Sequence, residues 1–199
     1  MGYLLPADYA AFGLGAETAD AWVTTASAMM EAYCRRPSLL VTSYTERMRV
    51  PVEAQTMRLS YGPLVSVTAV KEKYARPRCE EGEAFAWEVA AAFGLYGAWV
   101  SVDVTKLEVS VPTMELRFPT GLLGVRYSEA EVTYTAGVSV VPDALKVACA
   151  QIVRNAQATP GLNVKSSKMD TLQTQYFSDS LIDSNVQAIL RPYVAERLG

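Results

Sequence analysis

The chain has 199 residues, of which half are apolar and a fifth are charged, and its formal net charge is −3. This composition supports a sizeable core and excludes a chain that is disordered throughout. The small acidic excess argues against a general nucleic-acid-binding protein, which carries a surplus of Lys and Arg. The absence of histidine excludes Ser-His-Asp and Cys-His catalytic sites and histidine-based zinc sites.

The three cysteines, Cys34, Cys79 and Cys149, lie far apart and form no CxxC pair. They fit a reducing compartment better than a disulfide framework. The N-terminal residues lack the basic region and apolar core of a signal peptide, and no apolar run approaches the roughly 18 residues of a membrane span. We therefore expect a protein that is made in a cytoplasm-like environment and is not associated with a membrane.

Apolar residues at helical spacing predict a first helix over residues 18–34, with Thr18 as its N-cap and Pro37 preventing its continuation. The expected apolar face comprises Ala19, Trp22, Val23, Ala26, Met29, Met30 and Tyr33.

A β-rich block follows the first helix. Alternation of apolar residues at Val65, Val67 and Ala69 is typical of a strand, and the Tyr61-Gly62-Pro63 sequence indicates a turn before it. The full set of expected strands covers residues 39–50, 57–60, 65–73, 99–104, 107–111, 114–118 and 131–135.

Residues 76–97 interrupt the strand pattern with a polar, turn-rich stretch and then an Ala-rich, aromatic one. We interpret this segment as an insertion between strands that contains a short helix. Its aromatic residues are candidate contact points if they are exposed, and local packing onto the sheet is the alternative. These candidates are Phe85, Trp87, Phe93 and Tyr96.

The sequence from Val132 to Gly137 indicates a strand that ends in a turn, because Gly137 can adopt a conformation that most residues cannot. Pro142 suits a first helical turn and Asp143 the positive end of a helix. These residues predict a second helix over residues 142–158 that packs against the first. Its apolar stripe comprises Leu145, Ala148, Cys149, Ile152, Val153 and Ala156.

Residues 162–180 are rich in Ser, Thr, Gln and Lys, which indicates a linker or an extended arm. A last helix is expected to begin near Ser180 or Asp183 and to end or kink at Pro192. This helix could bind a neighbouring molecule or pack back on its own domain, and the sequence leaves both arrangements open. Its apolar positions are Ile182, Val186, Ile189, Leu190, Tyr193 and Val194.

Little in the sequence indicates chemistry, since it contains no phosphate-binding glycine motif. The carboxylate pairs lie in turns or polar segments, where solvated charge is the simpler interpretation. We expect no enzymatic activity and no cofactor. Two alternatives stay open: a ligand- or glycan-binding module that stacks on Trp87, Trp99 and Tyr96, and a carboxylate metal enzyme. The carboxylate pairs are Glu80-Glu81, Glu129/Glu131 and Asp179/Asp183.

Three motifs occur in a fixed order: EAYCRRP at residues 31–37, MRLSYGPLVSVTAV at residues 57–70 and VTYTAGVSVVPDALKVACAQIV at residues 132–153. In this order they resemble the head–tail connector (adaptor or head-completion) proteins of long-tailed bacteriophages. The resemblance covers residues 16–158, interrupted by the insertion, and the segment 162–199 exceeds the minimal family core.

The resemblance implies a ring, usually a dodecamer, that lies beneath the portal in the neck of the virion. Such a ring extends the DNA channel and offers a docking surface to the tail or the next connector. Double-stranded DNA would pass through without sequence-specific binding. In this family a C-terminal arm commonly engages the portal, so the six apolar positions of the last helix are candidates for portal or inter-subunit contacts.

The expected fold is α+β, with the two helices packed together beside an antiparallel sheet or a small β-barrel. We expect an adaptor core over residues 1–160 and an extended C-terminal arm, ending in a helix, over residues 161–199.

Overall fold

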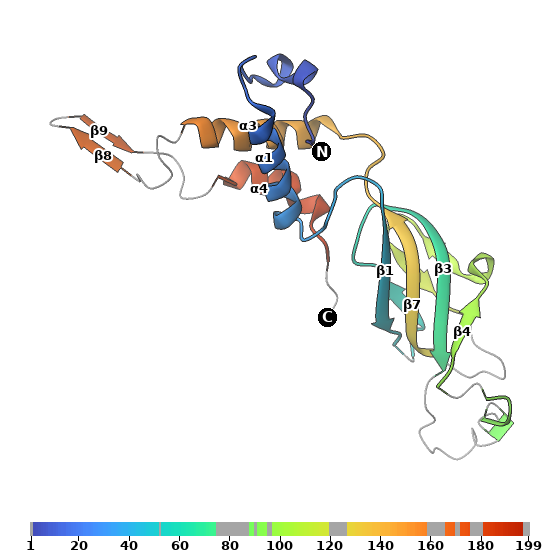
Figure 1. Ribbon diagram of the computed structural model, residues 1–199. Coiled ribbons are helices and arrows are strands. Elements are labelled where there is room, and N and C mark those ends of the chain that lie inside the picture. Colours follow the sequence, from blue (N-terminus) through green and yellow to red (C-terminus); the bar gives the residue numbers. More distant parts are fainter. Residues whose placement is uncertain are drawn as a thin grey trace. The chain divides into compact units, whose positions relative to one another are not determined.

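The computed structural model describes residues 2–51, 53–74, 88–89, 91–94, 97–119, 127–158, 166–169, 172–175 and 181–196. The chain divides into two compact units (Figure 1). The helical unit comprises Met1–Leu39 and Ser139–Val194, and the β unit comprises Leu40–Val138 and Ala195–Gly199. The expected boundary at residue 160 differs from this division, because the last helix groups with the other helices.

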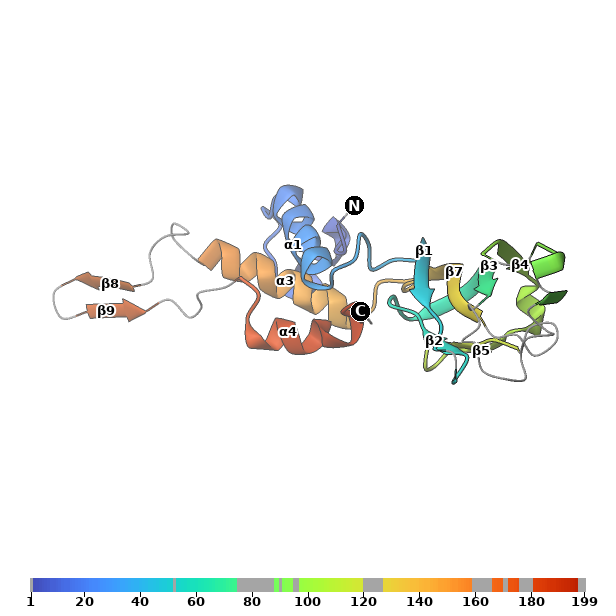
Figure 2. The ribbon, with the colours of Figure 1, turned by 90° about the horizontal axis from the view of Figure 1, so that it is seen from below.

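Three α-helices form the centre of the helical unit: α1 (Asp20–Tyr33), α3 (Asp143–Ala158) and α4 (Ser184–Leu190). Both α1 and α4 pack against α3 (Figure 2). Short 3-10 turns η1 (Pro6–Asp8) and η2 (Ala10–Phe12) precede α1, and η5 (Arg191–Tyr193) follows α4. The expected packing of the two longer helices is thus confirmed.

The buried face of α1 is narrower than its apolar spacing predicts. Val23, Ala26 and Met30 are buried, whereas the side chain of Trp22 is 44% exposed. The N-cap is Ala19 and not Thr18, and the backbone N–H of Thr18 donates to the carbonyl of Gly15 at 3.0 Å. The helix therefore begins two residues later than expected.

Helix α3 begins at Asp143. Pro142 precedes it, and its carbonyl accepts the N–H groups of Leu145 at 3.0 Å and Lys146 at 3.2 Å. The predicted apolar stripe faces the core, and Cys149 lies against α1, where its Sγ is 3.8 Å from Ser27 Oγ. Burial raises the pKa of this thiol, so it packs as a small apolar residue.

The β unit contains two antiparallel sheets. This arrangement confirms the α+β class, with open sheets in place of a barrel. The larger sheet runs in the order β1 (Thr42–Arg49), β7 (Tyr127–Ala136), β3 (Leu64–Tyr74) and β4 (Trp99–Val102). The smaller runs in the order β2 (Thr56–Arg58), β6 (Glu115–Arg117) and β5 (Glu108–Ser110), and the turn η3 (Val104–Lys106) connects β4 to β5.

Strand β7 lies between β1 and β3 and alternates in burial, as a half-buried strand does. Its buried residues share one hydrophobic core with residues of the smaller sheet, so the two sheets pack face to face. The fully buried members of this core are Leu59, Leu116, Ala130, Val132, Tyr134 and Ala136.

Strand β3 differs from the expected alternation. Val65 is 52% exposed, whereas Leu64, Val70 and Tyr74 are buried. The register with β7 shifts between Leu64 and Ser66 and again between Val67 and Ala69. Each irregularity of this kind adds a residue to one strand, which changes the face that the following side chains occupy.

Gly137 ends β7 at a point where two backbone segments nearly touch. It has φ of 128°, and a Cβ atom there would lie 2.4 Å from the carbonyl oxygen of Leu40. Its N–H donates to the carbonyl of Pro63 at 2.9 Å. The glycine predicted from the sequence as a turn residue is therefore also required by close backbone approach.

The segment expected as a polar linker contains a β-hairpin. Strands β8 (Ser166–Met169) and β9 (Leu172–Gln175) pair antiparallel with each other. After it, α4 begins at Ser184 with Asp183 as its N-cap, which confirms the later of the two predicted starts.

Candidate interaction surfaces

The six apolar candidates of the C-terminal segment divide into two groups. Val186 and Leu190 are fully buried within the helical unit. Ile182, Ile189, Tyr193 and Val194 are partly buried and reach the surface. The first two belong to the unit's own core, and the contact role of the other four stays a prediction.

Helix α4 is held on the helical unit by the side chain of Asn155. Its Nδ2 donates to the carbonyl of Leu181 at 3.1 Å and to Asp183 Oδ2 at 3.1 Å. Asp183 Oδ1 accepts the N–H of Val186 at 2.8 Å. The hydrogen bond from Val186 is the main cause that lowers the pKa of Asp183. Of the two arrangements left open by the sequence, the structure shows α4 packed on its own unit.

Beyond α4 the chain joins the β unit. Ala195 is buried there, and the N–H of Glu196 donates to the carbonyl of Ser60 at 3.0 Å. The carboxylate of Glu196 pairs with Arg58 at 2.9 Å. Ala195 and Glu196 therefore belong to the β unit, whereas α4 belongs to the helical unit.

The insertion is described in part. Phe85, Trp87 and Tyr96 lie outside the described residues. Phe93 follows the helical residues 88–89 and 91–92, and its N–H donates to the carbonyl of Val89 at 3.1 Å. Its side chain is 74% exposed, as a contact residue requires.

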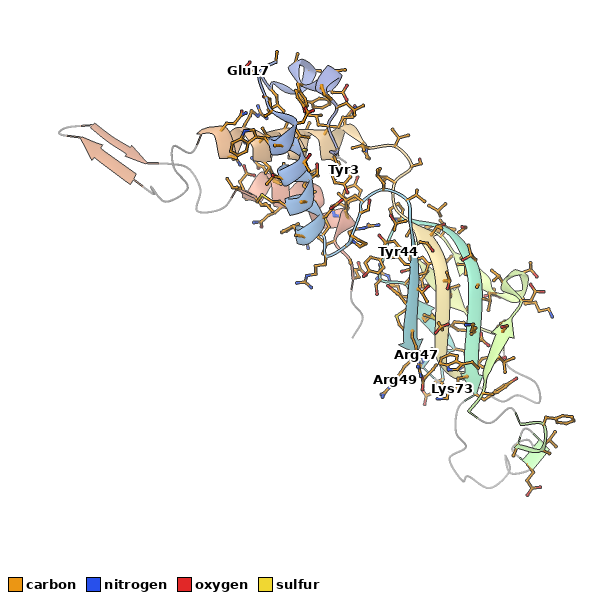
Figure 3. The ribbon with its side chains drawn as sticks, in the orientation of Figure 1. Tyr3, Glu17, Tyr44, Arg47, Arg49 and Lys73 are labelled. Carbon is orange, nitrogen blue, oxygen red and sulfur yellow. The ribbon has the colours of Figure 1, made fainter. Side chains whose placement is uncertain are left out.

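A charged cluster on the solvent face of the larger sheet was not predicted from the sequence (Figure 3). Arg47 on β1 pairs with Glu129 on β7, which also pairs with Lys73 on β3 at 3.5 Å. Lys71 and Glu131 pair at 3.1 Å. The hydrogen bond from Arg47 lowers the pKa of Glu129. Alternating charges in β3 and β7 were the available signal, but the pairing needed the register of three strands.

Trp99 on β4 lies beside this cluster. The guanidinium carbon of Arg47 is 4.7 Å from the centroid of its ring, and Lys73 Nζ is 6.0 Å away. These distances are those of cation–π contacts. Of the three aromatic residues considered for stacking on a ligand, the structure describes Trp99. Its ring contacts Arg47 and Lys73.

Glu72 is a buried carboxyl group in the core of the β unit. It is 0% exposed, and neither of its oxygens has a hydrogen-bond partner among the described residues. Burial raises its pKa to about 7, and the nearby Tyr127 hydroxyl acts in the opposite direction. Burial also raises the pKa of Tyr127. The sequence held a signal: with Lys71 and Lys73 facing solvent, the residue between them faces inward.

Within the described ranges, no three His, Cys, Asp or Glu residues come together as metal ligands. Glu129 and Glu131 are engaged in ion pairs, and Asp183 caps α4. Glu80, Glu81 and Asp179 lie outside the described residues. In the same part of the chain, no helix is long and apolar enough to cross a membrane.

Comparison with known proteins finds a likeness of structure. No family model matches the chain, and no curated protein matches it. One chain in the neck of an empty gene transfer agent (GTA) particle, computed with C6 symmetry, superimposes with a TM-score of 0.50 at 15% sequence identity. A chain in the virion of the native particle gives a TM-score of 0.51 at the same identity. The chain shares the fold of a GTA neck protein.

The likeness extends over almost the whole molecule. It covers 99% of this chain and 92% of the neck chain. The alignment therefore spans both the helical unit and the β unit. At 15% identity it establishes the architecture, and the roles of individual surfaces are considered below.

Proposed function

We propose that this chain is a structural protein of the neck of a phage-like particle and has no catalytic activity. The observation that carries the proposal is the fold shared with a neck chain over 99% of this sequence. The motifs at residues 31–37, 57–70 and 132–153 support it independently, because they resemble phage head–tail connectors in the same order.

Within the neck, the chain acts as a connector that forms a ring beneath the portal, extends the DNA channel and presents a docking surface to the tail. The gene transfer agent neck that contains the similar chain was computed with C6 symmetry. A sixfold arrangement accommodates a dodecamer as well as a hexamer, so it fits the copy number usual for this family. Rotational symmetry of this kind is the common way in which identical chains close a ring.

The contacts with the portal or the next subunit involve the accessible apolar residues of the C-terminal segment, with Val186 and Leu190 supporting them from the core. These accessible residues are Ile182, Ile189, Tyr193 and Val194. Phe93 marks a second contact region, together with Phe85, Trp87 and Tyr96 of the same segment.

A channel protein must let DNA pass without holding it. The net charge of −3 and the pairing of Arg47, Lys71 and Lys73 with carboxylates both limit attraction to phosphates. Clustered unpaired cations would instead add salt-dependent binding at each phosphate. The proposal therefore includes passage of double-stranded DNA without sequence-specific recognition.

The proposal is tested by measuring the mass of the purified chain by light scattering, alone and mixed with the portal protein of the same particle. A ring of six or twelve copies, visible as such by electron microscopy, is the expected product. Ile189→Glu should weaken binding to the portal or to other copies without changing the melting temperature. Val109→Glu on β5 is the matched control, since Val109 is an exposed valine in the other unit. A chain that stays monomeric and does not bind the portal protein would contradict the proposal.

A further inference from the structure

The β8–β9 hairpin pairs with no other strand among the described residues. Its register is regular: Ser166 lies opposite Gln175, and Met169 lies opposite Leu172 at the turn. An isolated two-stranded hairpin is at best marginally stable in water. Each of its outer edges carries backbone N–H and C=O groups that can bind another strand.

In the sequence the hairpin lies between α3 and α4, and the end of α3 contacts the start of α4. Asn155 near the end of α3 hydrogen-bonds to Leu181 and Asp183 at the start of α4, at 3.1 Å in both cases. These contacts hold the end of α3 beside the residues that begin α4. The described contacts between α3 and α4 therefore form without the hairpin.

The composition of the two strands limits what they can bind. Six of their eight residues are polar, and the two apolar ones, Met169 and Leu172, pair with each other at one end. Such strands cannot form the continuous apolar face by which a sheet packs onto a core. Binding by their backbone edges remains as the means of association.

We propose that the hairpin pairs edge to edge with the hairpins of adjacent copies, with β8 of one copy beside β9 of the next. This inference rests on the proposed ring. Rotational symmetry places the same two different edges together at every junction, and the antiparallel order of β8 and β9 then continues around the ring. Closure leaves no free edge. Polar strands suit a closed sheet with water on both sides.

The first test removes the hairpin. Residues 160–179 are replaced by a short Gly-Ser linker, which keeps Asn155, Leu181 and Asp183. The expected variant has the helical circular dichroism and melting temperature of the full chain. The concentration for half-assembly should rise about tenfold or more, because one of the linked contacts is lost. Rings that form as readily without the hairpin would overturn this inference alone, whereas a full chain that never assembles would overturn the proposed ring as well.

The second test locates the partner strand. Chains with Ser167→Cys and chains with Thr174→Cys, each with Cys79→Ser and a different tag, are co-expressed and oxidised. A cross-link that joins the two tags is expected, and neither variant alone should give it. Replacing Ser167→Cys by Thr25→Cys on α1 provides the matched control. Cross-linking of Thr174→Cys to Thr45→Cys on β1, or assembled rings without any cross-link, would overturn the pairing of hairpins.

Discussion

Asn155 on α3 and Asp183, the N-cap of α4, are joined by a hydrogen bond of 3.1 Å between Nδ2 and Oδ2. The same amide nitrogen also binds the carbonyl of Leu181. This side chain holds the start of α4 against α3, while Val186 and Leu190 bury α4 in the core of the helical unit.

Asn155→Ala should therefore lower the free energy of unfolding of the helical unit by about 1–2 kcal/mol, as expected for the loss of hydrogen bonds to a partly buried polar group. Asp183→Ala should cost about 1 kcal/mol through loss of the cap, and the two losses should not add because the residues share a bond. Chemical denaturation of the four chains of the double-mutant cycle measures this. Asn185→Ala, at an exposed position of α4, is the control, and additive losses would contradict the coupling.

Gly137→Ala should destabilise the β unit by about 2 kcal/mol or more, because the new Cβ meets backbone atoms of Leu40 and because φ is 128°. Gly94→Ala is a matched comparison. Gly94 also has a positive φ, 66°, but nothing lies within 4 Å of its Cβ position, so its cost should be about 1 kcal/mol. Equal melting temperatures for the two variants would show that the approach of Leu40 is unimportant.

Glu72 should make the stability of the β unit depend on pH. Its pKa is raised to about 7, so the folded state binds the proton more tightly than the unfolded state does. The stabilisation is complete below the ordinary pKa of about 4.3 and is lost as the pH rises through 7. Between pH 5 and pH 8 we expect the free energy of unfolding to fall by about 2 kcal/mol.

Glu72→Gln removes this titration and should flatten the pH profile. Glu131→Gln, which removes a partly exposed carboxylate of an ion pair, is the control for the change of residue type. Denaturation curves at several pH values provide the measurement. If the free energy of unfolding of Glu72→Gln still falls with pH as in the parent chain, the pH dependence belongs to another group.

Cys34 and Cys149 should be inert towards thiol reagents in the folded chain. Both are fully buried, and burial raises the pKa of Cys34 to about 11 and that of Cys149 in the same direction. The reactive species is the thiolate, which neither site supports. With Cys79→Ser, a colorimetric thiol assay at pH 8 should detect no reactive group until denaturant is added. Rapid labelling under native conditions would mean that the helical unit opens readily.

The sequence by itself determined the main helices and the α+β class, because helical spacing, β-branched residues, Gly137 and Pro142 act over a few neighbouring residues. The order of three motifs also indicated a protein of the phage neck, and a chain that shares the fold comes from the neck of a gene transfer agent particle. Five of the six positions predicted for the apolar stripe of α3 are buried, and the sixth, Ala156, is partly buried.

Only the tertiary structure decided which elements belong together, since this depends on contacts between residues far apart in the chain. The grouping of α4 with α3 involves the burial of Val186 and Leu190 and the hydrogen bonds of Asn155. The ion pairs of Arg47 and Lys73 with Glu129 depend on the placement of β7 between β1 and β3. The hairpin was missed because its polar strands carry no apolar alternation, and their pairing is a property of the backbone.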